Sequence, residues 1–284
     1  MVYDVAIIGT GPAGLSAALT LKLHNKEILW LGSNELSDKV GKSEKIANYP
    51  GVPMVSGADL NAAFAAQIKE MGLEPKDARV TNIADTGGKF MVLADNEVYE
   101  ARALLLATGM AAAKGMEGEA ELLGRGVSYC ATCDGFLYKD KTVAVFCTDE
   151  RMAHDIKYLE EICGKVYVYT SFGYTAAAEN TEILSKPIKK LSGGLKCDSA
   201  ELADGTKLDV DGVFILRPAI APATLFPGLE TDGAHIKTGR SQETNYKGCF
   251  AAGDCTGRPY QIAKAVGEGN VAAHAILEYL NGSE

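Results

Sequence analysis

A glycine-rich turn close to the N-terminus constrains the fold of this chain more than any other feature. An apolar run over residues 3–8 ends in Gly9-Thr10-Gly11-Pro12-Ala13-Gly14, and an Ala/Leu-rich stretch over 15–23 and a second apolar run over 27–31 follow. This order predicts strand, glycine turn, helix and strand, the start of a doubly wound parallel sheet. The three motif glycines permit a tight turn, let backbone N–H groups approach a pyrophosphate and pack the helix on the strand. We therefore predict a bound dinucleotide here, with a tight turn that holds no ligand as the alternative.

The ribose contact of this dinucleotide is left open by the sequence. An acidic residue is expected at the end of the second strand, but Gly32-Ser33-Asn34 stand there and Glu35 lies just beyond. Asn34 and Glu35 are therefore the candidate residues at this position.

The remaining apolar pattern extends the same α/β arrangement. We expect a helix over 58–71 capped by Ser56, a small antiparallel meander over 79–100, and a buried strand over 103–107 that ends in Thr108-Gly109. A second unit is expected to begin near residue 112. It is predicted to contain strands at 142–147, 165–170 and 212–216, a helix over 151–163 and a hairpin at Asp204-Gly205. A strand at 249–252 and a long helix that reaches Leu280 close the chain.

A closely spaced cysteine pair is the second chemical feature. In Cys130-Ala131-Thr132-Cys133-Asp134, the two intervening residues allow a small disulfide ring that opens and closes with little backbone movement. Asp134 is placed to supply the proton that thiol–disulfide exchange requires. Half of a zinc site is the alternative, but zinc needs four ligands and the sequence has no second Cys-x-x-Cys or His pair, so we predict no metal. The other five cysteines are most simply buried small hydrophobic residues.

Composition excludes several classes of function. The net charge of −9 argues against a partner such as nucleic acid. The longest strongly apolar runs, such as 103–107, have the length of a strand and are too short to cross a membrane. Residues 1–4 lack the basic start of a signal peptide, so we expect a cytoplasmic protein.

Together these motifs resemble those of the low-molecular-weight thioredoxin reductases, and the resemblance covers nearly the whole chain. The matching segments are Gly9 to Gly14, Asn48-Tyr49-Pro50-Gly51, Ala107-Thr108-Gly109, Gly126 to Gly135 and Ala251-Ala252-Gly253-Asp254. The resemblance implies a two-domain α/β flavoprotein that reduces thioredoxin and forms a homodimer. FAD would bind a discontinuous Rossmann-like domain, 1–112 and 217–284, and residues 113–216 would form a smaller, pyridine-nucleotide-like domain that carries the cysteines.

The resemblance also implies roles for single residues. Asp254 would bind the FAD ribityl chain, Gln261 and Ile262 would lie against the isoalloxazine, and Asn48 would lie near it. Cys133 would face the flavin, Cys130 would attack the protein substrate, and Asp134 would be the general acid. The full set of candidate FAD-binding residues is Gly9, Gly11, Pro12, Ala13, Gly14, Asn34, Glu35, Asn48, Val80, Thr108, Gly109, Gly253, Asp254, Gln261 and Ile262.

The second unit departs from that family at its own nucleotide site. Its first strand ends in Phe146-Cys147-Thr148-Asp149-Glu150-Arg151, which contains no glycine and places two carboxylates where phosphates would sit. The next strand is followed by Ser171-Phe172-Gly173-Tyr174, without the arginines that would bind a 2′-phosphate. The NADPH site is thus predicted to be lost, which narrows the resemblance to the ferredoxin-dependent flavin thioredoxin reductases.

The electron donor is therefore predicted to be ferredoxin. Ferredoxins are usually acidic, and Lys39, Lys42 and Lys45 form a basic cluster that could dock one; a solvated loop is the alternative. Two other functions remain open: the same enzyme driven by NADPH or NADH through a degenerate site, and a flavin-bound redox sensor without turnover.

Overall fold

The chain folds into two compact units in a computed structural model. The structure describes residues 1–41, 43, 45–109, 116–129, 131–217 and 221–282, and at positions 120, 132 and 133 it describes the backbone alone. Unit 1 comprises Met1–Ala113 and Ala221–Glu284, and unit 2 comprises Lys114–Ile220. Each unit has its own sheet and its own buried core.

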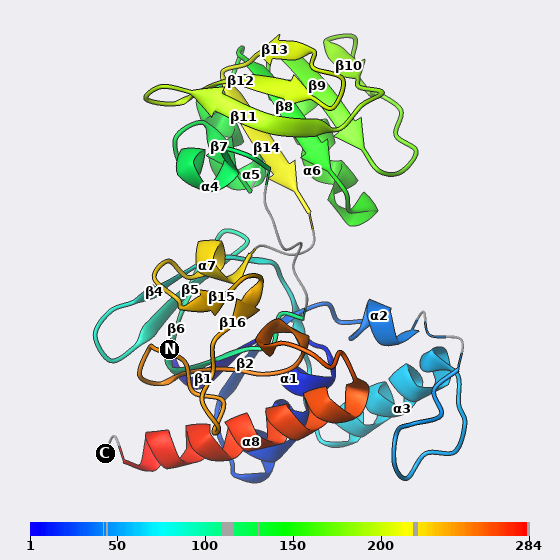
Figure 1. The fold of residues 1–284 in the computed structure, drawn as a ribbon, viewed down its shortest axis with the longest axis vertical. Coiled ribbons are helices and arrows are strands. Elements are labelled where there is room, and N and C mark those ends of the chain that lie inside the picture. The colour runs from blue at the N-terminus through cyan, green and yellow to red at the C-terminus, as the bar shows by residue number, and fades with distance from the viewer. Residues whose placement is uncertain (42, 44, 110–115, 130, 218–220, 283–284) are drawn as a thin grey trace. The chain divides into compact units, whose positions relative to one another are not determined.

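Unit 1 is built on a seven-stranded sheet (Figure 1). Its strands are ordered β3-β2-β1-β6-β5-β4, and β17 pairs with β6 beside this path. Neighbours among β3, β2, β1, β6 and β17 are parallel, whereas β4, β5 and the first half of β6 form an antiparallel meander. The strands are β1 (Val2–Ile8), β2 (Ile28–Gly32), β3 (Lys76–Asp77), β4 (Val80–Asp85), β5 (Phe90–Ala94), β6 (Glu97–Leu106) and β17 (Cys249–Ala251).

Strand β6 corrects one sequence-based expectation. A meander ending at residue 100 and a separate strand over 103–107 are in fact one ten-residue strand, Glu97–Leu106. No turn residue interrupts the chain between the two expected pieces. The first half of β6 pairs with β5, and the second half pairs with β1 and β17, so a single strand joins the meander to the parallel sheet.

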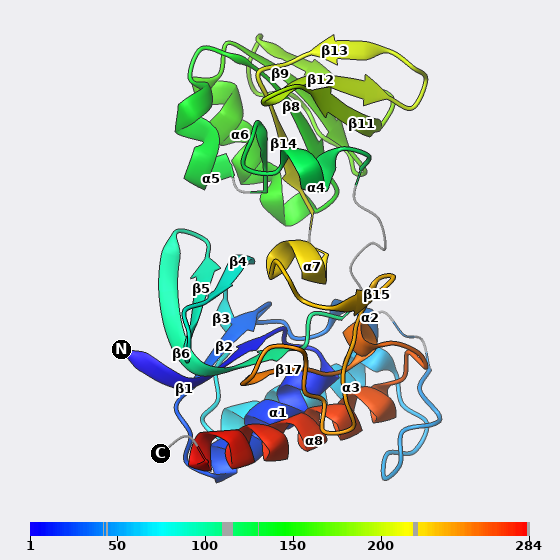
Figure 2. The same cartoon turned by 60° about the vertical axis from the view of Figure 1, so that its left-hand side comes forward.

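Helices of unit 1 pack on the sheet around an apolar core. Helices α1 (Pro12–Leu23) and α8 (Ile262–Asn281) run side by side on one face (Figures 1 and 2). Ser56 caps α3 (Gly57–Glu70) as predicted, because its hydroxyl accepts a hydrogen bond from the backbone N–H of Asp59. The other elements are α2 (Asp38–Gly41), α7 (Pro222–Leu225), β15 (Thr231–Asp232), β16 (His235–Ile236) and the short 3₁₀ helix η3 (Asp254–Thr256).

Unit 2 repeats the parallel α/β arrangement on a smaller scale. Its main sheet has the order β10-β9-β8-β14-β7, all parallel, and a three-stranded antiparallel meander β11-β12-β13 forms a second sheet. Helix α6 and the short α5 lie on one side of the main sheet, and the meander lies on the other (Figure 2). The strands are β7 (Val127–Ser128), β8 (Thr142–Cys147), β9 (Lys165–Thr170), β10 (Thr181–Ile183), β11 (Ile188–Gly193), β12 (Cys197–Leu202), β13 (Lys207–Asp209) and β14 (Gly212–Leu216); the helices are α4 (Glu119–Leu122), α5 (Ala131–Asp134), η1 (Gly135–Tyr138), η2 (Glu150–Met152) and α6 (Ala153–Ile162).

The predicted fold class is confirmed: the chain is a two-domain α/β protein with Rossmann-like sheets. The predicted helix over 151–163 begins slightly later than expected, since a 3₁₀ turn over Glu150–Met152 precedes α6. Among the described residues, no helix is both long and apolar enough to cross a bilayer.

Candidate functional site

The parallel strands of unit 1 bring most of the predicted cofactor-binding residues to one edge of the sheet. Strands β1, β2, β6 and β17 run parallel, so their carboxyl ends meet at this edge. Ligands of open α/β sheets bind at this edge. The residues that follow these four strands are the glycine turn after β1, Asn34 and Glu35 after β2, Thr108 and Gly109 after β6, and Gly253 and Asp254 after β17.

The glycine turn has the shape that a pyrophosphate requires. Gly9 has a φ of +114°, and a Cβ there would overlap the carbonyl oxygen of Ala107. A Cβ on Gly11, by contrast, would meet no atom of the described structure within 4 Å, so the backbone there faces open space. Helix α1 starts at Pro12 with no side-chain cap and no acidic residue in its first turn. Open space beside an uncapped helix N-terminus fits a bound anion.

The other predicted cofactor residues lie on several elements of unit 1. Asn34 and Glu35 lie in an exposed turn after β2. Val80 is the first residue of β4 and is buried, and since its side chain is apolar, only its backbone can offer polar contacts. Asn48 and Gln261, 213 residues apart in sequence, are joined by a 2.7 Å hydrogen bond from the Asn48 amide to Gln261 Oε1. Ile262, the first residue of α8, packs against the core.

Asp254 has a partner that the sequence does not reveal. Lys39 Nζ donates to Asp254 Oδ2 at 2.6 Å and lies 5.3 Å from the centre of the Tyr260 ring. Lys39, one of the three lysines considered for donor docking, is therefore paired with Asp254 at the carboxyl edge of the sheet in unit 1, which we call the flavin edge. Lys45 is exposed, and Lys42 lies outside the described residues.

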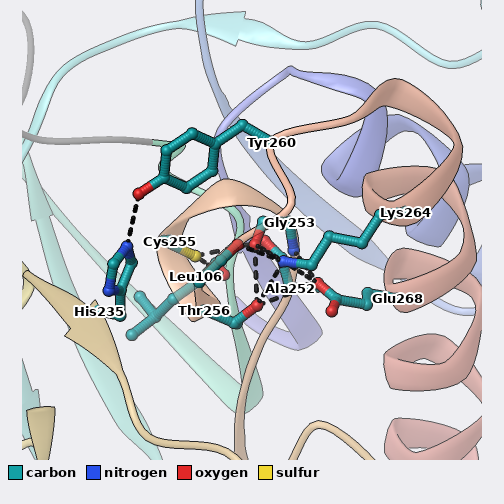
Figure 3. Close-up of polar contacts among 10 residues, drawn as sticks. Leu106, His235, Ala252, Gly253, Cys255, Thr256, Tyr260, Lys264 and Glu268 are labelled. Carbon is teal, nitrogen blue, oxygen red and sulfur yellow. Dashed lines mark hydrogen bonds and ion pairs between the residues drawn. The ribbon is translucent and has the colours of Figure 1, made fainter. Parts of the chain in front are cut away.

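The backbone around Gly253 is held by two charged side chains of α8 (Figure 3). Gly253 N–H donates to Glu268 Oε2, and Lys264 Nζ donates to Gly253 O, each at 2.8 Å. Sequence reasoning missed this pair, although its four-residue spacing on a predicted helix was a usable signal. Nearby, the His235 ring and the Tyr260 hydroxyl share a 2.8 Å hydrogen bond.

The segment that contains the predicted redox cysteine Cys133 follows strand β7 of unit 2. Cys130 lies outside the described residues, and Cys133 is described by its backbone alone, within α5 directly after β7. The structure also describes the side chain of Asp134, whose Oδ2 accepts a 2.6 Å hydrogen bond from the hydroxyl of Ser128. Burial, followed by the Asp134 charge, raises the pKa of the neighbouring Tyr138 phenol.

A buried ion pair lies next to the cysteine segment. Glu119 and Arg217, only 2% and 8% exposed, form a short ion pair, and the Tyr129 hydroxyl donates to Glu119 Oε1 at 2.6 Å. Glu119 Oε2 also accepts from the backbone N–H of Met116 at 2.6 Å. These contacts hold the side chain of Tyr129, the residue that directly precedes Cys130 in the sequence. Sequence reasoning missed them, since 98 residues separate the two charges.

The remaining cysteines behave as the sequence suggests. All five are buried. Burial raises the pKa of Cys163 and of Cys255 to about 11, and that of Cys249 to about 12. The thiols of these three cysteines are therefore protonated at neutral pH and unreactive, because only a thiolate is the nucleophile.

The turn after β8 differs sharply from the glycine turn after β1. Asp149 is 9% exposed, and its Oδ1 accepts from the backbone N–H of Arg151 at 3.1 Å. The Arg151 guanidinium then binds the same carboxylate through Nε and through Nη2, the latter at 2.8 Å. The chain's own carboxylate thus occupies the N-terminal end of this helical segment, where a pyridine nucleotide would place its pyrophosphate.

The loop after β9 folds back onto α6. Tyr174 donates its hydroxyl to the buried carboxylate of Glu160 at 3.1 Å, and the backbone N–H of Ala177 donates to the same oxygen at 3.2 Å. Phe172 and Tyr174 pack against the core of unit 2. Residues 171–180 of this loop contain no Lys or Arg.

Comparisons with known proteins agree with the geometry of both units. A model of the family described as pyridine nucleotide-disulphide oxidoreductase matches residues 3–152. The chain is 32% identical to a thioredoxin reductase of Listeria monocytogenes, over 98% of this chain and 94% of that protein. The chain therefore belongs to the pyridine nucleotide-disulphide oxidoreductases, and within them to the thioredoxin reductase family. FAD is the cofactor of this family, and the open glycine turn fits it.

Two solved structures are similar over the full chain. A ferredoxin-flavin thioredoxin reductase from Clostridium acetobutylicum is 38% identical with a TM-score of 0.91, covering 100% of this chain and 99% of that chain. A thioredoxin reductase from Gloeobacter violaceus is 29% identical with a TM-score of 0.81, covering 100% of this chain and 95% of that chain. The predicted resemblance is thereby confirmed at the level of the family.

Proposed function

We propose that this protein is a thioredoxin-disulfide reductase that receives its electrons from reduced ferredoxin through FAD. The observation that carries the choice of donor is the Asp149 carboxylate at the N-terminal end of the helical segment after β8, held there by Arg151. A pyridine nucleotide would have to displace this internal ion pair and bring its own phosphates next to a carboxylate. The likeness to the Clostridium ferredoxin-flavin enzyme supports the same conclusion.

FAD is proposed to bind at the carboxyl edge of the sheet in unit 1. Its pyrophosphate lies in the open space at Gly11, where backbone N–H groups and the N-terminus of α1 favour an anion. Asp254 binds the ribityl chain, and the hydrogen-bonded pair Asn48 and Gln261 lies beside the isoalloxazine. When bound, FAD accepts electrons singly and passes them on as pairs.

Two glycine substitutions test this placement. Gly11→Ala is expected to leave the fold intact, because Gly11 has a φ of −71° and its new Cβ meets no atom within 4 Å, yet to block the pyrophosphate. FAD per monomer, measured in the supernatant after denaturation, should therefore fall by about tenfold or more while the melting temperature of the flavin-free protein stays the same. Gly9→Ala is the contrasting variant, since its Cβ strains the flavin-free fold itself. Full FAD content in Gly11→Ala would contradict the proposed site.

The residues of unit 2 are proposed to reduce the thioredoxin disulfide. Cys130 attacks one sulfur of that disulfide and forms a mixed disulfide, Asp134 supplies a proton to the departing thiolate, and Cys133 then displaces reduced thioredoxin. With FAD bound, Cys133 would be the sulfur that exchanges electrons with it. The product in unit 2 is the Cys130–Cys133 disulfide, which two further electrons and protons return to the dithiol.

An apolar patch next to the pair suits a protein substrate. Phe136 and Leu137 lie in η1, three and four residues after Cys133, and are 64% and 53% exposed. Exposed aromatic and aliphatic side chains of this kind supply the buried centre of protein interfaces. The patch is proposed to contact thioredoxin.

The alternative donor, NADPH or NADH, is supported by the family description, which names pyridine nucleotides, and by the likeness to thioredoxin reductases that are not named as ferredoxin enzymes. The two donors are distinguished by supplying oxidised thioredoxin and the flavin-loaded protein with NADPH, NADH or reduced ferredoxin. We expect turnover with ferredoxin and no flavin bleaching by either nucleotide at tens of micromolar, because lost phosphate contacts and added repulsion cost on the order of several kcal/mol. Rapid turnover with NADPH would overturn the proposed donor. Reduction of the protein by ferredoxin without thioredoxin turnover would instead indicate a redox sensor.

A further inference from the structure

The turn that presents Asp254 is tied to α8 at both main-chain polar atoms of Gly253. Glu268 Oε2 accepts from Gly253 N–H, and Lys264 Nζ donates to Gly253 O, both at 2.8 Å (Figure 3). Gly253 itself has a φ of +89° and a ψ of −152°, a conformation that favours glycine. Two side chains of one helix hydrogen-bond to this backbone.

The same two side chains hold the rest of the turn. Lys264 Nζ also donates to Gly257 O at 2.8 Å and to Thr256 Oγ1 at 3.0 Å. The Thr256 hydroxyl donates to Glu268 Oε2 at 3.0 Å, and Lys264 and Glu268 form an ion pair at 3.0 Å. We call Thr256, Lys264 and Glu268 the α8 clasp. It closes the segment from Gly253 to Gly257 into a network of hydrogen bonds.

The clasp is screened from water and is neutral as a pair. The side chains of Lys264 and Glu268 are only 16% and 20% exposed. Partly buried, hydrogen-bonded charges of this kind resist rearrangement, since loss of one leaves the other without its partner. Because the charges cancel, the clasp acts on the flavin edge through geometry rather than through a net field.

The turn that the clasp holds lies close to the glycine turn after β1. A Cβ on Gly253 would lie 3.0 Å from the Cβ of Ala13, so the turn after β17 packs closely on the first turn of α1. Asp254 follows Gly253 directly, and its carboxylate is held separately by Lys39 at 2.6 Å. The glycine turn and Asp254 would grip opposite parts of one FAD molecule, so small movements of the turn change both contacts.

We propose that Lys264 and Glu268 are positioning residues for FAD, which hold the Gly253–Gly257 turn so that Asp254 meets the cofactor. This inference rests on the FAD site proposed above. Neither side chain needs to touch the flavin, because both act through the backbone of Gly253. Residues that orient a ligand-binding group in this way typically change affinity by about ten- to a hundredfold when they are removed.

The test measures FAD affinity in the full-length protein freed of flavin, by titration with FAD and its fluorescence. Lys264→Met and Glu268→Ala are each expected to raise the Kd by about tenfold or more. The double variant should match the weaker single variant rather than the product of the two, because either loss opens the same turn. Lys264→Arg retains a cation and should keep most of the affinity. Glu278→Gln, which removes an exposed carboxylate farther along α8, is the matched control and should bind as the wild type does.

A merely structural role gives a different pattern. The melting temperature of the flavin-free protein would then fall while the Kd for FAD stayed the same, and this result overturns the proposal. Asp254→Ala separates the clasp from the site itself. If this variant binds FAD normally, the proposed FAD site is wrong; if it binds weakly while the clasp variants bind normally, only the clasp fails. Should Glu268→Ala not fold, the decision rests on Lys264→Met against Lys264→Arg, judged by the same criteria.

Discussion

Serine at either position of the cysteine pair is expected to abolish thioredoxin reduction. Cys130→Ser and Cys133→Ser each remove one of the two sulfurs that disulfide exchange requires, so no intramolecular disulfide can form. FAD content should stay unchanged in both variants, because the proposed FAD site lies in unit 1 and the cysteines lie in unit 2. The loss is measured as thioredoxin-disulfide turnover with reduced ferredoxin as the donor.

The two variants are expected to differ in a way that assigns the thiols. Cys130→Ser leaves Cys133 free to form a long-wavelength charge-transfer band between its thiolate and the flavin. Cys133→Ser should lack this band but should accumulate a stable mixed disulfide with thioredoxin through Cys130. A band that appears in Cys133→Ser instead would reverse the two roles.

Cys163→Ala provides the matched control for these variants. Cys163 is a buried, free cysteine of the same unit, and burial raises its pKa to about 11, so it does not act as a nucleophile at neutral pH. Its replacement should leave turnover per flavin essentially intact. Loss of turnover in this variant would show that the effects of the serine variants are not specific to the pair.

Much of the fold could be predicted because apolar periodicity and turn residues are local signals. The strands Thr142–Cys147, Lys165–Thr170 and Gly212–Leu216 have the bounds that the sequence predicts. The division of β6 into two pieces was wrong because the pattern changes along the strand, from one exposed face in the meander to full burial in the parallel sheet. Periodicity reports the environment of a segment and does not report where a strand ends.

The candidate site was predictable only where a motif marks it. The glycine turn and the cysteine pair stand out in sequence, and the structure places the residues after four parallel strands at one edge. Ion pairs between residues that are far apart in the sequence have no such motif. Lys39 and Asp254 are 215 residues apart, and Glu119 and Arg217 are 98 apart. These ion pairs exist because the topology brings strand ends together, which the sequence specifies only through the whole fold.

The two units carry different turns after strands β1 and β8 of their main sheets. After β1 the chain has glycines, open space and an uncapped helix N-terminus. After β8 it has Asp149, which satisfies the N–H of Arg151 and binds its guanidinium. The internal carboxylate thus takes a position that an external anion could otherwise occupy. Our proposal is that the strand–turn–helix framework of unit 2 serves as the scaffold for the cysteine pair.

Asp134→Asn is expected to slow disulfide reduction by about a hundredfold or more, because the amide cannot transfer a proton to the departing thiolate. The exchange of Asp for Asn is nearly isosteric. The Asn oxygen can still accept the hydrogen bond that Ser128 donates to Asp134 Oδ2 at 2.6 Å, so the local structure should survive. Reduction of the bound flavin by dithionite should proceed as in the wild type, since this step needs no proton from Asp134.

Ser128→Ala separates proton transfer from orientation. This variant keeps the carboxylate and removes the hydroxyl that orients it, so thioredoxin turnover should fall by only a few-fold, far less than in Asp134→Asn. Both rates are measured under saturating reduced ferredoxin, with the rate of flavin reduction by dithionite as the internal reference. Unchanged turnover in Asp134→Asn would reduce Asp134 to a structural acceptor for Ser128. Equal losses in the two variants would show that the orientation of this side chain, rather than its proton, limits the reaction.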